Sequence, residues 1–426
     1  MRFALESLFK RIDDLRDDVV SLTQDLVRIP TVNPPGDAYT PCAELMGERL
    51  RKAGFDVVYE RGVGTPGDSD KHPRTNIVAR IQGNRPGPCV HFNGHIDVVE
   101  PGEGWTKDPY GAELENGKIY GRGTCDMKGG IAAAMVAMEA ILQEGLDFAG
   151  AIEISGTVDE ETGGYGGVAY LAEKGFFSRP RVDHVIIPEP LNVDRVCIGH
   201  RGVWWAEVKT HGHIAHGSMP FLGDCAVRHM GAFLNALETE LYPALETRHT
   251  EMPVVPEGAK QSTLNIASMH GGLPDNFNGL PSSLVPDLCS MILDRRFLIE
   301  EPLDQVKGEI LAILDRLTES RDGFRYDVRD IMEFEPTLTD ENAPVVRAVA
   351  EEIERQFGRP AETICSPGTY DQKHIFRIGQ LKDCIAYGPG ILDLAHQPDE
   401  YIEVDAMVTS MKVMASATLK LLNGNG

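Results

Sequence analysis

The sequence has no apolar run long enough to span a membrane and none of the features of a secretory leader. A membrane helix needs about 18 consecutive apolar residues, whereas the best run, from Ile131 to Leu142, is shorter and contains Glu139. The N-terminal segment MRFALESLFKRIDDLRDD lacks the apolar core and small-residue cleavage site of a signal peptide. The eight cysteines show no CxxC spacing, which favours reduced thiols over disulfides. We therefore expect a cytoplasmic protein.

Positive charge is also in short supply. Lysine and arginine number 41 against 65 aspartate and glutamate residues, which gives a net charge of −24 at pH 7. An acidic surface repels nucleic-acid phosphates and anionic lipids, so neither nucleic acid nor a membrane is an expected partner. The apolar fraction of 42% and charged fraction of 25% are ordinary for a globular chain. The length of 426 residues suggests two or three domains of about 150 residues each.

Short apolar runs of strand length alternate with helical patterns over most of the chain. The runs rich in β-branched residues are 76–81, 89–92, 151–158, 184–187 and 384–387. Helical spacing occurs in the first thirty residues, with Leu15, Val19, Leu22 and Leu26 on one face, then over 41–53 and 127–142. This alternation predicts an α/β fold with a mixed, mostly parallel sheet sandwiched by helices.

A middle segment follows a different order. From about residue 200 to 334 the pattern predicts strand, helix, two strands, helix and strand, which is the ferredoxin-like α+β unit. The α/β pattern then resumes. We therefore predict an α/β domain made of residues 1–199 and 336–426, with a second domain, residues 200–335, inserted into it.

Acidic and histidine residues follow several of the predicted strands, at the edge where open α/β sheets bind ligands. His95, Asp126, Glu161, Glu189 and His396 could together hold two divalent ions if one carboxylate bridges them. Zn²⁺ suits this donor set, and Mn²⁺ or Co²⁺ would also fit. Each residue taken singly is more often a solvated loop or helix-cap residue, so the prediction depends on their convergence. Two further carboxylates, Asp97 and Glu160, could orient His95 and serve as general base.

Longer motifs surround these residues in a fixed order. They are GHIDVV at 94–99, YGRGTCDMKGG at 120–130, TVDEETGG at 157–164, PEP at 188–190, GHIAHGSMP at 212–220, DRR at 294–296 and GPGILDLAHQPDEYI at 388–402. With them, residues from about 20 to 415 resemble the dinuclear-metal peptidase and deacylase family. That family includes acetylornithine deacetylase, succinyl-diaminopimelate desuccinylase, aminoacylase and glutamate carboxypeptidase.

The resemblance implies a role for each metal-site residue. Asp126 would bridge two ions, with His95 and Glu189 completing one site and Glu161 and His396 the other. Asp97 would orient His95, and the Asp126–Met127 peptide would be cis. Glu160 would take a proton from the water shared by the ions and pass it to the leaving amine.

The inserted domain would act as a lid and as the dimer interface in this resemblance. His216 would reach the partner's active site in a homodimer and stabilise the oxyanion. Arg296 would bind a substrate carboxylate, although a structural salt bridge is the alternative. A separate zinc site at His211, His213 and His216 is the weaker interpretation of the histidine cluster.

The sequence differs from the family pattern at positions that, in the family, take part in substrate recognition. Gln372 and Lys373 stand where relatives carry a small residue and arginine, and lysine lacks the planar fork that grips a carboxylate. Ser283 stands in place of a frequent asparagine, next to an insertion at 273–281. We expect Arg296, Gln372 and Lys373 to contact a small carboxylate substrate, whose identity the sequence leaves open.

Three functions are compatible with these features. The first is a dinuclear metal-dependent hydrolase of C–N bonds that deacylates a small N-acyl amino acid, with a dipeptidase as a variant. The second is an aminohydrolase that releases ammonia from an electron-poor aromatic amine such as a nitroaromatic amino acid. The third is a binding protein without activity, which the complete set of ligands and the base argue against.

Overall fold

The chain forms two compact units in the computed structural model, which describes residues 2–273 and 283–424. Unit 1 comprises Met1–Gly199, Leu338–Ile364 and Tyr370–Gly426, and unit 2 comprises His200–Thr337 and Cys365–Thr369. The boundaries expected from the sequence differ chiefly at Cys365–Thr369, which the α/β pattern assigns to the first domain. The insertion noted at 273–281 lies, from residue 274 onward, outside the described residues.

The larger sheet contains nine strands within the described residues. Their order is β1 (Asp56–Arg61), β2 (Thr75–Gln82), β6 (Ala149–Thr157), β3 (Arg85–His95), β7 (His184–Ile187), β15 (Cys384–Ala386), β8 (Arg195–His200) and β13 (Thr337–Leu338), with β14 (Glu362–Ser366) paired to β8. The four central strands, from β6 to β15, run parallel, and β1, β2 and β8 are antiparallel to their neighbours. The predicted mixed, mostly parallel α/β sheet is therefore confirmed.

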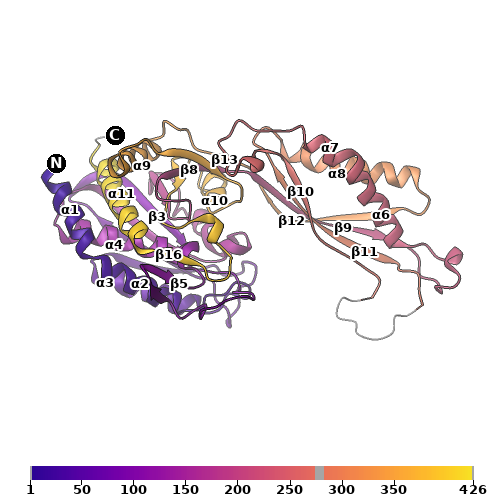
Figure 1. Cartoon of the computed structure of the whole chain (residues 1–426), viewed down its shortest axis with the longest axis horizontal. Coiled ribbons are helices and arrows are strands. Elements are labelled where there is room, and N and C mark those ends of the chain that lie inside the picture. Colours follow the sequence, from indigo (N-terminus) through magenta and orange to yellow (C-terminus); the bar gives the residue numbers. More distant parts are fainter. Residues whose placement is uncertain (1, 274–282, 425–426) are drawn as a thin grey trace. The chain divides into compact units, whose positions relative to one another are not determined.

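Helices cover this sheet closely (Figure 1). They are α1 (Arg2–Asp14), α2 (Arg16–Val27), α3 (Tyr39–Lys52), α4 (Gly129–Gln143), α5 (Tyr170–Glu173), α9 (Pro344–Phe357), α10 (Gln372–Arg377) and α11 (Val404–Asn423). A Cβ on Gly94 would lie 2.3 Å from Ile131 of α4, and one on Gly156 would lie 2.8 Å from Met46 of α3. These two glycines therefore let both helices approach the centre of the sheet.

Two helical predictions need correction. The helix expected in the first thirty residues is broken at Leu15 into α1 and α2, both of which pack on α4 and α11. The helix expected over 127–142 begins at Gly129, because Asp126 and Met127 have non-helical backbone angles. A small sheet of β16 (Tyr401–Glu403), β5 (Lys118–Tyr120) and β4 (Glu113–Glu115) was not expected.

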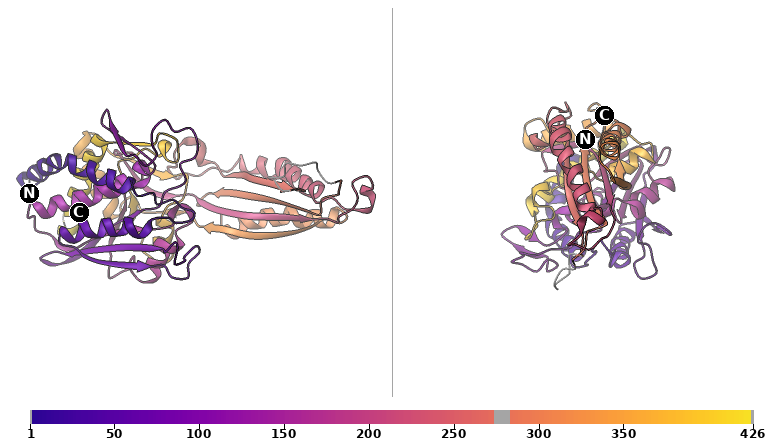
Figure 2. Two further views of the ribbon diagram at one scale, coloured as in Figure 1. Left: turned by 90° about the horizontal axis from the view of Figure 1, so that it is seen from below. Right: turned by 90° about the vertical axis from the view of Figure 1, so that its right-hand side faces the viewer.

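Unit 2 has the predicted ferredoxin-like order of elements. Its elements are β9 (Gly202–His211), α6 (Ala226–Ala236), α7 (Tyr242–Leu245), β10 (Thr263–Gly271), β11 (Leu288–Phe297), α8 (Leu303–Ser320) and β12 (Arg325–Phe334). The antiparallel sheet has the order β10-β11-β9-β12, and its helices lie on one face of it (Figures 1 and 2). Alternate residues of β9, including Trp204, Ala206 and Val208, point into the core beneath α6 and α8.

None of the helices in the described part of the chain combines the length and apolar character that a membrane crossing requires. The eight cysteines are free thiols, as their spacing suggests.

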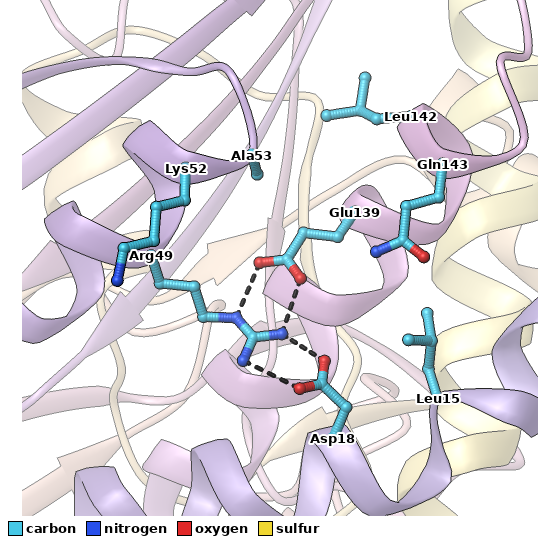
Figure 3. Close-up of a pocket in the computed structure, with 8 residues that line it drawn as sticks. All are labelled: Leu15, Asp18, Arg49, Lys52, Ala53, Glu139, Leu142 and Gln143. Carbon is cyan, nitrogen blue, oxygen red and sulfur yellow. Dashed lines mark hydrogen bonds and ion pairs between the residues drawn. The ribbon is translucent and has the colours of Figure 1, made fainter.

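A charged cluster joins three helices of unit 1 beside a pocket of about 570 Å³ (Figure 3). Arg49 of α3 donates to both carboxylate oxygens of Glu139 on α4, at 2.8 and 2.6 Å. The same guanidinium bonds Asp18 of α2, at 3.3 Å through one of its nitrogens. Because Glu139 is buried, this charge-assisted bridge ties the three helices together.

We predict that Arg49→Met destabilises unit 1. The substitution leaves the buried Glu139 carboxylate without its partner, at a cost of about 2 kcal/mol after allowing for partial exposure of Arg49. Thermal unfolding followed by circular dichroism should show a lower midpoint. The control is Lys52→Met, which changes an exposed lysine of the same pocket; equal shifts for the two variants would contradict the bridge.

Candidate metal centre

The residues expected to carry chemistry meet at one edge of the larger sheet. His95 ends β3, Glu160 and Glu161 follow β6, and Glu189 follows β7. His396 lies in the loop that follows β15. Because these four strands are parallel, their carboxyl ends lie at the same edge.

One group of metal-type donors consists of His95, Asp126 and Glu189. The His95 Nε2 atom lies 3.0 Å from Asp126 Oδ1 and 3.9 Å from Glu189 Oε1. The other ring nitrogen, Nδ1, donates to the Asp97 carbonyl oxygen at 3.0 Å. That hydrogen bond directs Nε2 towards the two carboxylates, which is the usual arrangement of a ligating histidine.

A second group consists of Asp126, Glu161 and His396. The His396 Nε2 atom lies 3.1 Å from Glu161 Oε1 and 3.5 Å from Asp126 Oδ2. Asp126 therefore offers one oxygen to each group. The Asp126–Met127 peptide bond is cis, as the family resemblance implies.

The electrostatics of these groups suit divalent cations. Burial raises the pKa of Glu161 to about 7, and burial together with the Asp126 charge raises the pKa of Glu189 well above its usual range. Hydrogen bonds to Asp126 and Glu161 raise the pKa of His396 to about 10. Crowded carboxylates that hold protons for lack of positive charge would release them to a cation. The donor set of two imidazoles and three carboxylates therefore fits two divalent ions.

Asp97 has a broader structural role than the orientation of His95. Its side-chain oxygens accept hydrogen bonds from the backbone amides of Glu160 and Glu161, both at 3.1 Å, and from the Asn33 side chain at 2.9 Å. Its own carboxylate oxygen lies 3.6 Å from His95 Nδ1. Asp97 thus fixes the turn that carries Glu160 and Glu161, in addition to holding His95 through its carbonyl group.

Glu400, which was not singled out from the sequence, holds the backbone of the turn at Asp126 as Asp97 holds that of Glu160 and Glu161. One of its oxygens accepts from the amides of Gly123, Cys125 and Asp126 at 3.0, 2.8 and 3.1 Å. Its other oxygen pairs with the buried Arg122 guanidinium. The only signal in the sequence was the position of Glu400 in the last motif, and its contact with a segment some 275 residues earlier is invisible to spacing.

A second missed cluster lies beneath the Glu160 turn. Asp159 has a positive φ of 63° and is buried. It accepts from Arg74 Nε at 3.0 Å and from the Tyr39 hydroxyl at 2.9 Å. Asp159 is therefore a structural carboxylate, whereas Glu161 belongs to the second donor group and Glu160 pairs with Lys373.

The two departures from the family pattern, Gln372 and Lys373, have different environments. The Gln372 amide is buried and donates to the carbonyl oxygens of Ile198 and Cys384 at 3.3 and 2.8 Å. The Lys373 ammonium pairs with Glu160 Oε1 at 2.6 Å. Substrate contact by either residue stays a prediction, and the contacts of Gln372 are those of a structural residue.

The predicted residues of unit 2 lie on its sheet and on a loop. Arg296 of β11 pairs with Asp294 at 2.7 Å and lies 5.9 Å from the Trp205 ring. His216 is exposed and its Nδ1 lies 2.7 Å from the Ser218 hydroxyl. Its proposed contact with a partner subunit stays a prediction.

Arg201, which was not singled out from the sequence, is a buried cation of unit 2. Its side chain donates to the carbonyl oxygens of Pro367 and Gln261, both at 3.0 Å. Burial and the neighbouring Arg296 lower the pKa of Arg201 to about 10. Among the described residues it forms no ion pair.

Comparison with known proteins agrees with the sequence resemblance. Residues 91–420 match the profile of peptidase family M20/M25/M40. The succinyl-diaminopimelate desuccinylase of Methylobacterium nodulans is 36% identical over 284 residues, which cover 63% of this chain and 69% of that protein.

Solved structures share the fold over nearly the whole chain. The di-peptidase Dug1p of Saccharomyces cerevisiae superposes with a TM-score of 0.78 at 17% identity, covering 99% of both chains. The Bacillus subtilis protein YXEP, described as a dinuclear metal-binding peptidase, gives a TM-score of 0.68 at 14% identity and covers 96% of this chain and 99% of its own. At these identities the likeness shows the fold alone.

We predict that the metal-free protein loses stability as the pH rises from about 5 to 9. The pKa of Glu161, ordinarily 4.5, is raised to about 7, and that of His396, ordinarily 6.5, to about 10. The folded state then binds more protons than the unfolded state, so the free energy of unfolding falls as pH rises through these values.

The measurement is the thermal midpoint across this pH range, in chelator and in excess Zn²⁺. Because ligands bind a cation in their deprotonated form, Zn²⁺ should flatten or reverse the slope. Equal slopes with and without the ion would contradict the assignment of these residues to a metal centre.

Proposed function

Because the chain belongs to peptidase family M20/M25/M40 and is a hydrolase, we propose that it is a divalent-metal-dependent amidohydrolase that deacylates a small N-acyl amino acid. One observation carries this proposal: two groups of metal-type donors share Asp126, and Glu160 lies next to one of them in sequence. The name of the desuccinylase relative supports an acyl amide as the bond that is cleaved.

His95, Asp126 and Glu189 would hold one ion, and Asp126, Glu161 and His396 the other. Zn²⁺ is the ion we propose, and Mn²⁺ or Co²⁺ are the alternatives that the same donors accept. When bound, such ions supply Lewis acidity to the amide carbonyl group and to the attacking water.

Glu160 would move the proton of the reaction. Its carboxylate would accept a proton as water attacks the carbonyl carbon, and would then donate that proton to the nitrogen of the leaving amine. Each turnover would consume one water and release a carboxylic acid and an amine. General acid–base catalysis of this kind contributes about 10²–10⁴-fold to a rate.

One cationic residue of unit 2 supports a substrate that carries a carboxylate. Arg296 is paired with Asp294, and we propose, as the family resemblance implies, that it binds the carboxylate of the substrate. A guanidinium group can bind it through two parallel hydrogen bonds.

We also propose a homodimer formed through unit 2, with His216 donating to the oxyanion in the partner's site. Large apolar side chains are exposed beside His216: Phe221 is 79% exposed and Leu222 60%, and Ile214 and Met219 lie in the same loop region. An apolar cluster next to a polar hydrogen-bond donor is suited to a protein interface.

The first prediction from this proposal is the product of the reaction. Protein stripped of metal and reloaded with Zn²⁺, Mn²⁺ or Co²⁺ is offered N-succinyl and N-acetyl amino acids, dipeptides and aromatic amines. Mass spectrometry should detect a carboxylic acid and an amino acid in equal amounts, and only with metal present. Release of ammonia with a hydroxylated ring would instead assign an aminohydrolase, and cleavage of dipeptides alone would assign a dipeptidase.

The control for this experiment is Glu160→Gln. The variant should bind as much metal as the unaltered protein, measured by plasma emission spectrometry, and lose activity by about 10²–10⁴-fold. Loss of both ions together with activity would make Glu160 a ligand and not the base.

The second prediction concerns the oligomeric state. Gel filtration with light scattering should give a dimer, and Phe221→Asp combined with Leu222→Asp should give a monomer of low activity. Val63→Asp is the control, since Val63 is an equally exposed apolar residue of unit 1, at 67%. A monomer with full activity would remove the role of His216 across the interface.

A further inference from the structure

A buried ion pair connects α10 to the proposed general base. The Lys373 ammonium group lies 2.6 Å from Glu160 Oε1, and both side chains are largely shielded from solvent, at 2% and 11% exposure. Among the described residues, the other oxygen of Glu160 has no protein hydrogen-bond partner. One oxygen of the carboxylate is therefore held by the chain and the other is available to a water molecule.

The neighbours of Lys373 fix its position. Gln372 is bonded to the carbonyl oxygens of Ile198 and Cys384. His374 donates from Nε2 to the carbonyl oxygen of Gly163 at 2.6 Å, which joins α10 to the turn that carries Glu160. Asp371, just before α10, accepts from the Asn93 amide at 2.8 Å. Lys373 thus projects from a segment anchored on both sides, and its ammonium group is preorganised with respect to Glu160.

These contacts separate two roles for Lys373. To bind a substrate carboxylate, Lys373 would have to give up the carboxylate of the chain with which it is already paired, and its side chain is buried. These contacts favour a role for Lys373 in the chemistry of Glu160 over a role in substrate recognition.

We propose that Lys373 is a positioning residue for Glu160. It holds Oε1 so that Oε2 points to the attacking water, and it does not touch the substrate. The inference rests on the proposed function, because it takes Glu160 as the base. A displacement of the catalytic base by about 1 Å costs about 10²-fold in the rate of the reaction.

The kinetic test compares Lys373→Met and Lys373→Arg on the substrate that the product screen identifies. For Lys373→Met we expect kcat to fall about 10²-fold, with KM and metal content close to those of the unaltered enzyme. Lys373→Arg should recover most of kcat, since it restores a cation at Oε1. Lys382→Met, an exposed lysine just beyond α10, is the matched control and should leave both constants unchanged. A rise in KM with kcat unaltered in Lys373→Met would overturn the proposal and assign Lys373 to the substrate.

A thermal test does not depend on activity. Glu160→Gln should lower the unfolding midpoint of the metal-loaded protein, because the buried Lys373 ammonium loses its charged partner. Adding Lys373→Met to Glu160→Gln should recover part of the loss, and independent, additive effects of the two substitutions would overturn the ion pair. If no amide is hydrolysed but the two substitutions are coupled, the proposed function fails while the ion pair stands. Amide hydrolysis without coupling would instead support the proposed function and overturn the positioning role of Lys373.

Discussion

Mutual repulsion among carboxylates is the constraint on which the candidate centre depends. Asp97, Asp126, Glu160, Glu161 and Glu189 converge on one edge of the sheet, and most of them are shielded from water. Unbalanced negative charge in such a place is costly. The chain offsets part of it with His95, His396 and Lys373, while burial, with the Asp126 charge as a further cause, raises the pKa values of Glu161 and Glu189. Divalent cations would supply the missing charge.

The loops that bear these residues are held by other carboxylates, which accept hydrogen bonds from backbone amides. Asp97 holds the amides of Glu160 and Glu161, and Glu400 holds three amides of the turn at Asp126. A carboxylate accepts several such bonds at once, so a single side chain can fix a turn that has no regular structure. The same side chain that adds to the negative charge therefore also gives the ligands their geometry.

The features of the fold and the site that could be predicted from the sequence are those that depend on residues close together in the chain. The parallel strands and the residues at their ends are local patterns, so the sequence alone was sufficient to place His95, Glu161 and Glu189 at one edge. The late start of α4 reflects the non-helical backbone at Asp126 and Met127, in a turn held by the distant Glu400, and spacing does not reveal it. Glu400 and Arg74 act on segments far away in the chain. Their side chains are as polar as those of solvated residues, so nothing local distinguishes them.

At Lys373, the role suggested by the departure from the family sequence differs from the contact that the side chain makes in the structure. A lysine in place of arginine suggests altered carboxylate recognition, because lysine lacks the planar fork. In the structure the same lysine pairs with Glu160. A compact ammonium group is sufficient to bind a single carboxylate oxygen. Because Lys373 would then hold Glu160 and not the substrate, the loss of the fork carries no penalty for substrate binding.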